Sequence, residues 1–385
     1  MDIGELKSQI GALRGEIEDG LRLAAGRILE AFDDDPFEIL AYRGYGNAMR
    51  ARVYGRVIEK PNVSAATEVD STLRNLLNTY RRAESDPLAF ASLKTEYAGS
   101  TVDCRTDNEG FFSGWIENAE PKKGEWEKYD VELVSPAAEA SKVTGNGEIL
   151  VPPSTARFCV VSDIDDTVIQ SRVTSFLQAA RTVMLGNART RLPFPGVAGF
   201  YQALRAGVSG EEKNPIFYVS SSPWNIYDVI SDFMDIQKIP KGPLVLRDWD
   251  ISVSALGSSR HSEHKGAAIR NLMKLYPEMR FILIGDTSQK DPEIYREIVG
   301  EFPERVMAVY IRDVNRSAER KSSVEKLAKE VLEAGSTLVL ADDTLAAARH
   351  AAAQGWIHDG SLEVVTEEKR ADEGSNDSKV PAAPA

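Results

Sequence analysis

The chain has 385 residues, with 46 basic and 59 acidic side chains and a formal net charge of −13 at pH 7. This acidic balance opposes non-specific attachment to nucleic acid or to an anionic membrane surface. The sequence contains no apolar run of about 18 residues, so we expect no transmembrane helix. The first residues lack the basic and apolar regions of a signal peptide, and we therefore expect a cytoplasmic location.

Residues 4–31 carry apolar side chains at near-helical spacing, which predicts a long helix within an N-terminal segment of residues 1–35. The polar face of this helix holds at least as many acids as bases. Packing on the rest of the protein, or on a second copy as a dimer seam, is therefore favoured over binding at a membrane surface. The sequence leaves the oligomeric state open.

Residues 36–150 show short runs of alternating apolar and polar residues separated by turn formers, with a helix expected over 69–82. Such spacing is typical of a small β-sandwich-like domain. The Asn146-Gly147 pair, interpreted as a turn, and Pro152-Pro153 mark its end. The clearest strands are expected at Ser92–Tyr97, Thr101–Arg105, Phe111–Glu117 and Tyr129–Val134.

Residues 151–365 alternate apolar strand-like runs with helical patterns, which predicts an α/β domain with a doubly wound parallel sheet. From about residue 366 to residue 385 the chain is polar and then rich in Pro and Ala, so we expect a disordered tail. The strands are expected at Phe158–Ser162, Ile216–Ser220, Leu244–Leu246, Phe281–Gly285, Val306–Ile311 and Thr337–Ala341.

Two of these apolar runs end abruptly in carboxylates. Asp163, Asp165 and Thr167 follow the first, and Gly285-Asp286 closes the fourth. Because catalytic sites of open α/β sheets lie at the carboxyl ends of the strands, we expect Asp163, Asp165 and Asp286 to surround one hard cation such as Mg²⁺. The alternative is an acidic turn followed by a helix cap, since Asp and Thr both favour caps.

Two further features suit an anionic ligand. Ser220, Ser221 and Ser222 follow the second apolar run and precede a helix, where hydroxyls and free backbone N–H groups favour phosphate. Lys265 stands near the start of another expected helix, against the dipole preference for acids there. Each signal is weak by itself, because serine-rich turns and surface lysines are common.

Together these motifs resemble those of the haloacid dehalogenase (HAD) superfamily of phosphotransferases, in the same order along the chain. Within it, several runs are similar to the catalytic domain of actin-patch-type phosphatidate phosphatases and their bacterial relatives. These runs are Ser162–Thr167, Tyr218–Trp224, Leu246-Arg247-Asp248, Ile284–Tyr295 and Tyr310–Val314. The resemblance covers roughly residues 150–355, and it implies a HAD-like fold for the second domain.

The resemblance also implies roles for individual residues. Asp163 would be the nucleophile that forms an aspartyl-phosphate, and Asp165 the general acid and base, with its backbone carbonyl on the metal. Asp286 would bind Mg²⁺, and Asp291 would be a further ligand or lie beside one. The phosphate would be held by Ser220 and Lys265, with Thr167 orienting the loop and Ser222 as the alternative to Ser220.

The family's substrate is phosphatidate, which the residues by themselves do not show. The gap 170–194 holds apolar residues at helical spacing beside Arg181, Arg189 and Arg191, which suits a lipid phosphate and leaves peripheral membrane contact open. A helix packed on the sheet explains the same pattern. The alternatives are a phosphatase for a soluble organic phosphomonoester and a catalytically inert binding or scaffold protein. A nucleic-acid partner is disfavoured by the net charge of −13.

Overall fold

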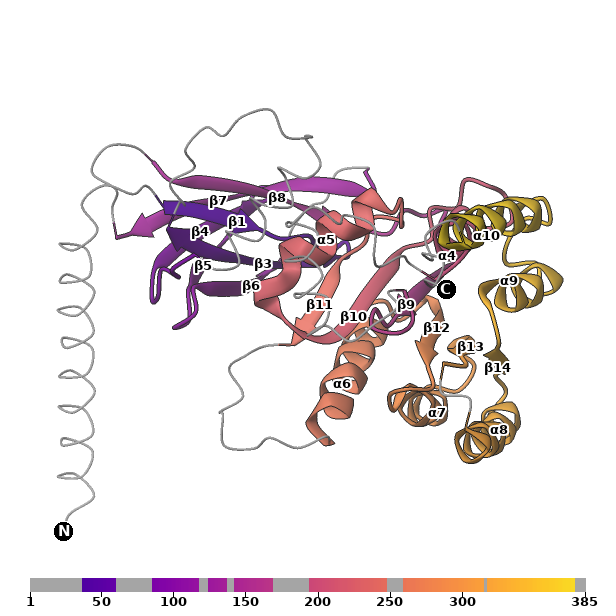
Figure 1. The fold of residues 1–385 in the computed structure, drawn as a ribbon. Coiled ribbons are helices and arrows are strands. Elements are labelled where there is room, and N and C mark those ends of the chain that lie inside the picture. The colour runs from indigo at the N-terminus through magenta and orange to yellow at the C-terminus, as the bar shows by residue number, and fades with distance from the viewer. Residues whose placement is uncertain are drawn as a thin grey trace, which may run out of the picture.

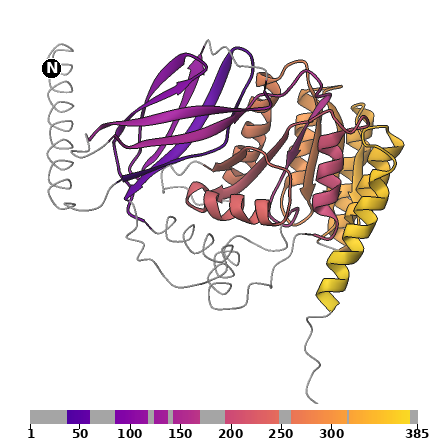
Figure 2. The same ribbon diagram turned by 90° about the horizontal axis from the view of Figure 1, so that it is seen from above.

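The computed structural model describes residues 37–59, 85–117, 124–136, 142–168, 194–247, 259–314 and 317–377. The predicted helices over 4–31 and 69–82, and the arginines of the 170–194 gap, lie outside these ranges. The described chain forms a mixed α/β structure with two sheets, one largely antiparallel and one parallel. In Figures 1 and 2 the antiparallel sheet lies at one end of the molecule, and the last helix, α10, lies at the other.

The antiparallel sheet holds the eight strands from the first part of the chain. They form one hydrogen-bonded sheet, in which only β2 and β8 run parallel, rather than the two separate sheets of a sandwich. All of its strands except β2 bury side chains in a common core, because apolar residues alternate along them. The strands are β1 Phe37–Ala41, β2 Gly44–Gly46, β3 Arg50–Glu59, β4 Ser92–Tyr97, β5 Ser100–Arg105, β6 Phe111–Glu117, β7 Trp126–Ser135 and β8 Thr144–Leu150.

The prediction of a turn at Asn146-Gly147 is wrong, because both residues lie within β8 and pair with β7. Gly147 is opposite Tyr129, and a Cβ atom at this glycine would come within 2.3 Å of the tyrosine ring. The Tyr129 hydroxyl donates to the Tyr42 carbonyl at 2.6 Å. The glycine therefore makes room for a buried ring within a strand, and it is not a sign of a turn.

The parallel sheet has the order β11-β10-β9-β12-β13-β14. Its six strands agree with the predicted ones to within a few residues at each end, because each is a buried apolar run bounded by polar residues. They are β9 Phe158–Ser162, β10 Ile216–Pro223, β11 Leu244–Arg247, β12 Arg280–Asp286, β13 Val306–Arg312 and β14 Leu338–Ala341.

Helices cover both faces of the parallel sheet. Figure 1 shows α6, α7 and α8 on one face and α4, α9 and α10 on the other, as right-handed connections require. The helices are α4 Val197–Ala206, the short 3₁₀ helix η1 Trp224–Ile226, α5 Tyr227–Ile236, α6 Ser259–Leu275, α7 Asp291–Glu301, α8 Ala318–Glu333, α9 Thr344–Ala353 and α10 Ser361–Asp377.

The prediction of a disordered tail from residue 366 is wrong as far as Asp377, because α10 occupies this stretch. The helix buries Val365 completely, and the carboxylates of Glu368 and Asp372 accept hydrogen bonds from backbone N–H groups of Gly199 and Gly196 at the start of α4. Most of α10 is polar because only one edge of the helix is buried. Its contacts with α4 cannot be predicted from amino-acid composition.

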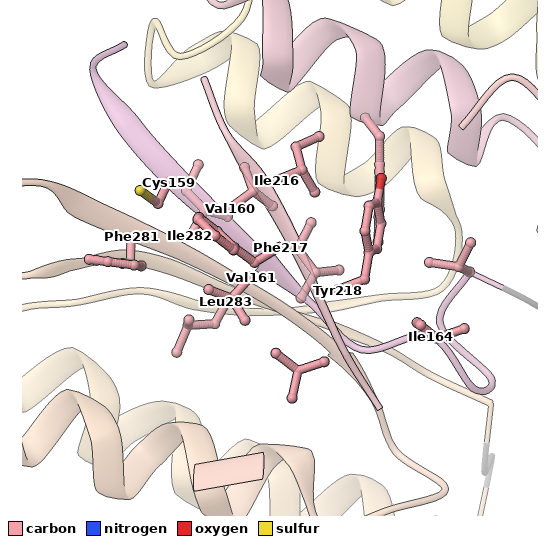
Figure 3. Close-up of a cluster of buried hydrophobic side chains, with 14 of the residues drawn as sticks. Cys159, Val160, Val161, Ile164, Ile216, Phe217, Tyr218, Phe281, Ile282 and Leu283 are labelled. Carbon is pink, nitrogen blue, oxygen red and sulfur yellow. The ribbon is translucent and has the colours of Figure 1, made fainter. Parts of the chain in front are cut away.

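The central strands of the parallel sheet are buried on both faces. Figure 3 shows Val160, Phe217 and Leu283 from three neighbouring strands packed together, and all three residues are fully buried. Burial of one such side chain stabilises the fold by about 1.5–3 kcal/mol. The strands that carry the polar residues at their ends are therefore firmly fixed.

The two sheets share this hydrophobic core. Tyr45 of β2 packs edge-on against Phe217 at 5.7 Å between ring centroids, and Tyr54 of β3 packs against Trp224 at 5.1 Å. The backbone N–H of Arg43 also donates to the Tyr227 hydroxyl at 2.8 Å. The antiparallel sheet is thus packed directly beside the end of β10, which carries the three serines.

Candidate active site

The candidate site lies at the carboxyl edge of the parallel sheet, where the strand order reverses. From β9 the chain first builds β10 and β11 on one side and then β12, β13 and β14 on the other. Such a switch point leaves a crevice outside the strand ends, where α/β sheets bind ligands. Asp163 directly follows β9, and its backbone N–H donates to the Ile284 carbonyl of β12 at 2.9 Å.

Three carboxylates meet at this edge. Oxygen atoms of Asp163, Asp286 and Asp291 all lie within 4.8 Å of one another, and the three residues are at most 1% exposed. Gly285 permits this close approach of the carboxylates. It lies within β12, and a Cβ atom there would be 2.4 Å from the Asp291 carboxylate.

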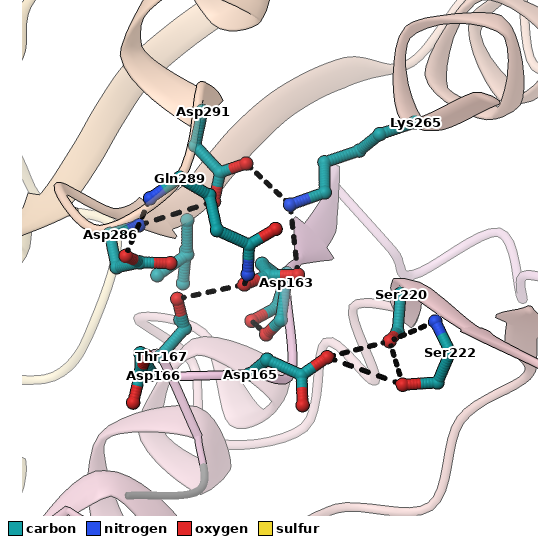
Figure 4. A network of polar contacts seen from close by, with 12 residues as sticks. Asp163, Asp165, Asp166, Thr167, Ser220, Ser222, Lys265, Asp286, Gln289 and Asp291 are labelled. Atoms are coloured by element: carbon teal, nitrogen blue, oxygen red, sulfur yellow. Dashed lines mark hydrogen bonds and ion pairs between the residues drawn. The ribbon is translucent and has the colours of Figure 1, made fainter. Parts of the chain in front are cut away.

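Lys265 supplies the positive charge within this cluster (Figure 4). Its ammonium group lies 2.9 Å from Asp163 Oδ1 and forms a second ion pair with Asp291. Burial lowers the pKa of Lys265, but the two carboxylates raise it further, so the net shift is upward and the lysine stays charged. One ammonium group cannot neutralise three carboxylates.

The remaining negative charge fits a divalent cation. Burial, followed by the charge of Asp291, raises the pKa of Asp286 to about 6. Among the described residues, no group donates a hydrogen bond to the buried Oδ2 atom of Asp286. An unpartnered carboxylate oxygen beside two other carboxylates is a donor set that suits Mg²⁺.

Asp165 does not join this cluster with its side chain, contrary to the expectation from the sequence. Among the described residues, the grouped carboxylates are those of Asp163, Asp286 and Asp291. The Asp165 carboxylate instead accepts hydrogen bonds from the Ser220 hydroxyl at 2.9 Å and the Ser222 hydroxyl at 3.3 Å. Burial raises the pKa of Asp165 despite these two donors, which favours its protonated form.

Both candidate serines lie in the site. Alternation along β10 puts Ser220 and Ser222 on one side, where their hydroxyls are 2.8 Å apart, while the Ser221 hydroxyl is buried without a hydrogen-bond partner among the described residues. Thr167 donates to Asp163 Oδ2 at 3.4 Å. All eight predicted site residues therefore gather at this edge of the sheet (Figure 4).

Two residues without a predicted role also contribute. The Gln289 side chain donates to Asp163 Oδ2 at 3.5 Å, and Arg320 of α8 donates to the carbonyls of Thr287 and Gln289 at 2.9 and 2.6 Å. Gln289 lies between the predicted site residues Asp286 and Asp291, so its position in the sequence could have indicated a role in the site. Arg320 is about 30 residues further along the chain, and no sequence pattern marks it.

Residues 158–313 match the family model described as "Phosphatidate phosphatase APP1, catalytic domain". Phosphatidate phosphatase APP1 of Saccharomyces cerevisiae is 28% identical over 159 residues, which cover 41% of this chain and 26% of the yeast protein. An uncharacterized protein of Schizosaccharomyces pombe is 28% identical over 160 residues, covering 40% of this chain and 25% of that protein. The family resemblance predicted from the motifs is confirmed.

The chain spans about a quarter of the length of these curated relatives. Among solved structures, a carbohydrate acetylesterase from Xanthomonas citri aligns over 78% of this chain and 75% of its own, with 11% identity and a TM-score of 0.25. That score is too low to support any inference. Within the described ranges, each helix is too short or too polar to cross a membrane.

Proposed function

We propose that this protein hydrolyses phosphatidate to diacylglycerol and phosphate, because residues 158–313 match the family model of the phosphatidate phosphatase APP1 catalytic domain. The proposal includes Mg²⁺ as cofactor, a HAD-like doubly wound catalytic domain beginning near residue 151, and an aspartyl-phosphate intermediate. A cytoplasmic protein that contacts membranes peripherally fits a lipid substrate.

In the first step, a carboxylate oxygen of Asp163 attacks phosphorus, and the bond from phosphorus to the ester oxygen breaks. Asp165 gives its proton to the departing alkoxide. In the second step, Asp165 takes a proton from water, the water oxygen attacks phosphorus, and the bond to Asp163 breaks. Phosphate leaves, and both aspartates return to their starting states.

Mg²⁺ held by Asp163, Asp286 and Asp291 would offset the negative charge of the nucleophile and the phosphate, so that two anions can meet. Lys265 and the hydroxyls of Ser220 and Ser222 would bind phosphoryl oxygens. Thr167 and Gln289 donate to the second oxygen of Asp163 and orient the nucleophile.

The observation that carries the proposal is the position of Lys265 between Asp163 and Asp291, 2.9 Å from the proposed nucleophile. An inert scaffold has no reason to keep three carboxylates buried in mutual repulsion. A phosphatase for a soluble phosphomonoester would use the same residues, so the choice of substrate needs a direct test.

The test measures phosphate release from phosphatidate in mixed micelles and from phenyl phosphate, with Mg²⁺ and with a chelator. We expect turnover of the lipid by the wild type with Mg²⁺, none by Asp163→Asn, and unchanged turnover by Asp359→Asn, which alters an exposed aspartate. Turnover of phenyl phosphate alone would refute the lipid substrate and keep the chemistry. No turnover of either ester would favour the scaffold.

A further inference from the structure

A cavity of about 730 Å³ lies at the carboxyl ends of β13 and β14, beside the acidic cluster. Its lining includes Phe194, Arg312, Thr344 and Lys369, together with five carboxylates. The volume is in the range of small-molecule sites and far exceeds the space that one phosphate needs. The roles proposed above for the acidic cluster and the serines leave this cavity unexplained.

Arg312, the last residue of β13, differs from the other cation of this lining, Lys369, in having no carboxylate partner within the part of the chain that the structure describes. Its guanidinium group stacks 4.0 Å from the centroid of the Phe194 ring, and its Nη2 atom donates to the Thr344 hydroxyl at 2.8 Å. Among the described residues, its buried Nε–H group has no acceptor, and no carboxylate lies within ion-pair distance of it. Arg320, by contrast, forms an ion pair with Glu293.

An arginine in this state has unused donors. Burial lowers the pKa of Arg312 to about 10, so the group is charged at neutral pH although its desolvation is only partly offset. A buried N–H donor without an acceptor costs free energy that a bound acceptor would recover. Stacking on Phe194 and the bond to Thr344 hold the guanidinium plane in place, so the donors are oriented in advance.

The cavity adjoins the reacting groups through Asp166 and Arg312. Asp166 lines the cavity, directly follows Asp165, and accepts a hydrogen bond from the Ser288 hydroxyl at 3.2 Å. Its φ of 57° is unusual for a residue other than glycine and turns the chain sharply at this point. On the other side, Arg312 pairs in register with Asp286.

The charges of the lining restrict the ligand. Five carboxylates against Arg312 and Lys369 disfavour a second anionic group, and Lys369 is already paired with Asp343. The free donors of Arg312 require oxygen acceptors. A neutral alcohol with ester carbonyls or hydroxyls satisfies both conditions, whereas a purely hydrocarbon group is neutral but offers no acceptor to Arg312.

We propose that this cavity receives the neutral leaving group of the phosphomonoester substrate, and that Arg312 binds its acceptor oxygens. The inference rests on the proposed phosphatase function and adds a specificity-determining residue to it. Arg312 therefore selects among phosphomonoesters by what the alcohol carries, while the residues around Asp163 bind the phosphoryl group common to all of them.

The experiment compares kcat and KM for three esters with Mg²⁺: dioctanoylglycerol phosphate, glycerol 3-phosphate and phenyl phosphate, whose leaving group has no further oxygen. For Arg312→Gln we expect KM to rise about 10- to 100-fold for an ester with acceptor oxygens, the loss typical of a hydrogen bond to a charged group. KM for phenyl phosphate should change less than about twofold. Arg296→Gln, at a half-exposed arginine, is the matched control.

The pattern across esters identifies the acceptor. A rise for the dioctanoyl ester alone points to ester carbonyls, and a rise for glycerol 3-phosphate as well shows that Arg312 also binds hydroxyls. An equal change for all three esters, or none, would overturn the inference while leaving the phosphatase function intact. If the wild type hydrolyses none of them, the proposed function itself fails, and this inference fails with it.

Two further variants protect the test against misfolding. Thr344→Val removes the acceptor that holds Arg312 and keeps the side-chain shape, so it should raise the same KM values selectively but by a smaller factor. Arg312→Lys keeps the charge but loses the Nε–H donor and the planar fork. If Arg312→Gln lowers the melting temperature, we expect Arg312→Lys to return it toward the wild-type value. KM for the oxygen-bearing esters should nevertheless stay high in Arg312→Lys. Full recovery of KM by lysine would contradict direct recognition by the guanidinium.

Discussion

The rings of Tyr54 and Trp224 pack against each other with centroids 5.1 Å apart, which joins the antiparallel sheet to the segment that follows Ser222. Trp224 also stacks on Tyr42 at 5.7 Å with the ring planes 2° apart. Since Ser222 lies only two residues before Trp224 and donates to Asp165, this interface fixes one side of the candidate site. The packing of the antiparallel sheet on Trp224 therefore helps to position Ser222 in the candidate site.

Replacing Tyr54 with leucine should weaken that connection. The ring is 8% exposed and its hydroxyl contacts that of Tyr45 at 3.0 Å, so we expect Tyr54→Leu to lower the free energy of unfolding by about 2 kcal/mol. We also expect kcat to fall several-fold, because Ser222 loses its fixed position. Phe90→Leu, at an exposed ring 41% accessible, is the control for both measurements. A destabilised variant with wild-type kcat would show that the interface serves folding only.

Removing Asp286 should weaken metal binding. Asp286→Asn keeps an oxygen that can accept from the backbone N–H of Ser288, but it removes one negative charge from the metal site. We expect at least a roughly tenfold higher Mg²⁺ concentration for half-maximal activity. Thermal unfolding with and without Mg²⁺ gives a second readout, since Mg²⁺ should raise the melting temperature of the wild type more than that of the variant. An equal response of the two proteins would remove Asp286 from the metal site.

The same residue predicts how the stability of the metal-free protein depends on pH. The pKa of Asp286 is raised from 3.8 to about 6 in the folded state, chiefly by burial. The folded protein therefore binds the proton more tightly than the unfolded chain. The contribution of Asp286 to stability is therefore greatest below about pH 4, and about 3 kcal/mol of it is lost as the pH rises to about 6 and above.

Burial also raises the pKa of Asp163 and of Asp165, so these two groups likewise reduce the stability of the metal-free protein as the pH rises. Urea unfolding in the presence of a chelator at pH 4 and pH 7 tests the contribution of Asp286. We expect Asp286→Asn to be more stable than the wild type at pH 7 by about 3 kcal/mol and similar to it at pH 4. A variant less stable than the wild type at both pH values would contradict the raised pKa.

Sequence patterns were most informative where burial and chemistry coincide. The run Phe158–Ser162 predicts a strand with the bounds that β9 has, because every residue in it is buried and a polar residue follows. The acids at the ends of β9 and β12 are predictable as neighbours, because the carboxyl ends of adjacent parallel strands meet at one edge of the sheet. The direction of a side chain is harder to predict, and Asp165 turns toward two serines rather than toward the other carboxylates.

The remaining errors concern contacts between distant segments. Gly147 faces the ring of Tyr129, so its place in β8 depends on a partner strand and not on its own neighbours in the chain. Arg320 reaches the loop after β12 from α8, and α10 is stabilised by the start of α4. In each case the stabilising partner lies far away in sequence, where local periodicity carries no information.

The contact between α10 and α4 gives the last prediction. The start of α4 has no side-chain cap of its own, and Gly196 there has a φ of 73°. Its free N–H groups donate instead to two carboxylates of α10, with 2.9 Å between Gly196 N and Asp372 Oδ2 and a second bond from Gly199 to Glu368. These acids also complement the positive end of the α4 dipole.

We expect Glu368→Ala and Asp372→Ala each to lower the free energy of unfolding by about 1 kcal/mol, the usual effect of removing a helix cap. Glu367→Ala, at an exposed glutamate on the same helix, should have little effect. Urea unfolding of the three variants provides the comparison. If Glu367→Ala costs as much as the other two, the effect comes from α10 itself and not from its bonds to α4, since only Glu368 and Asp372 reach that helix.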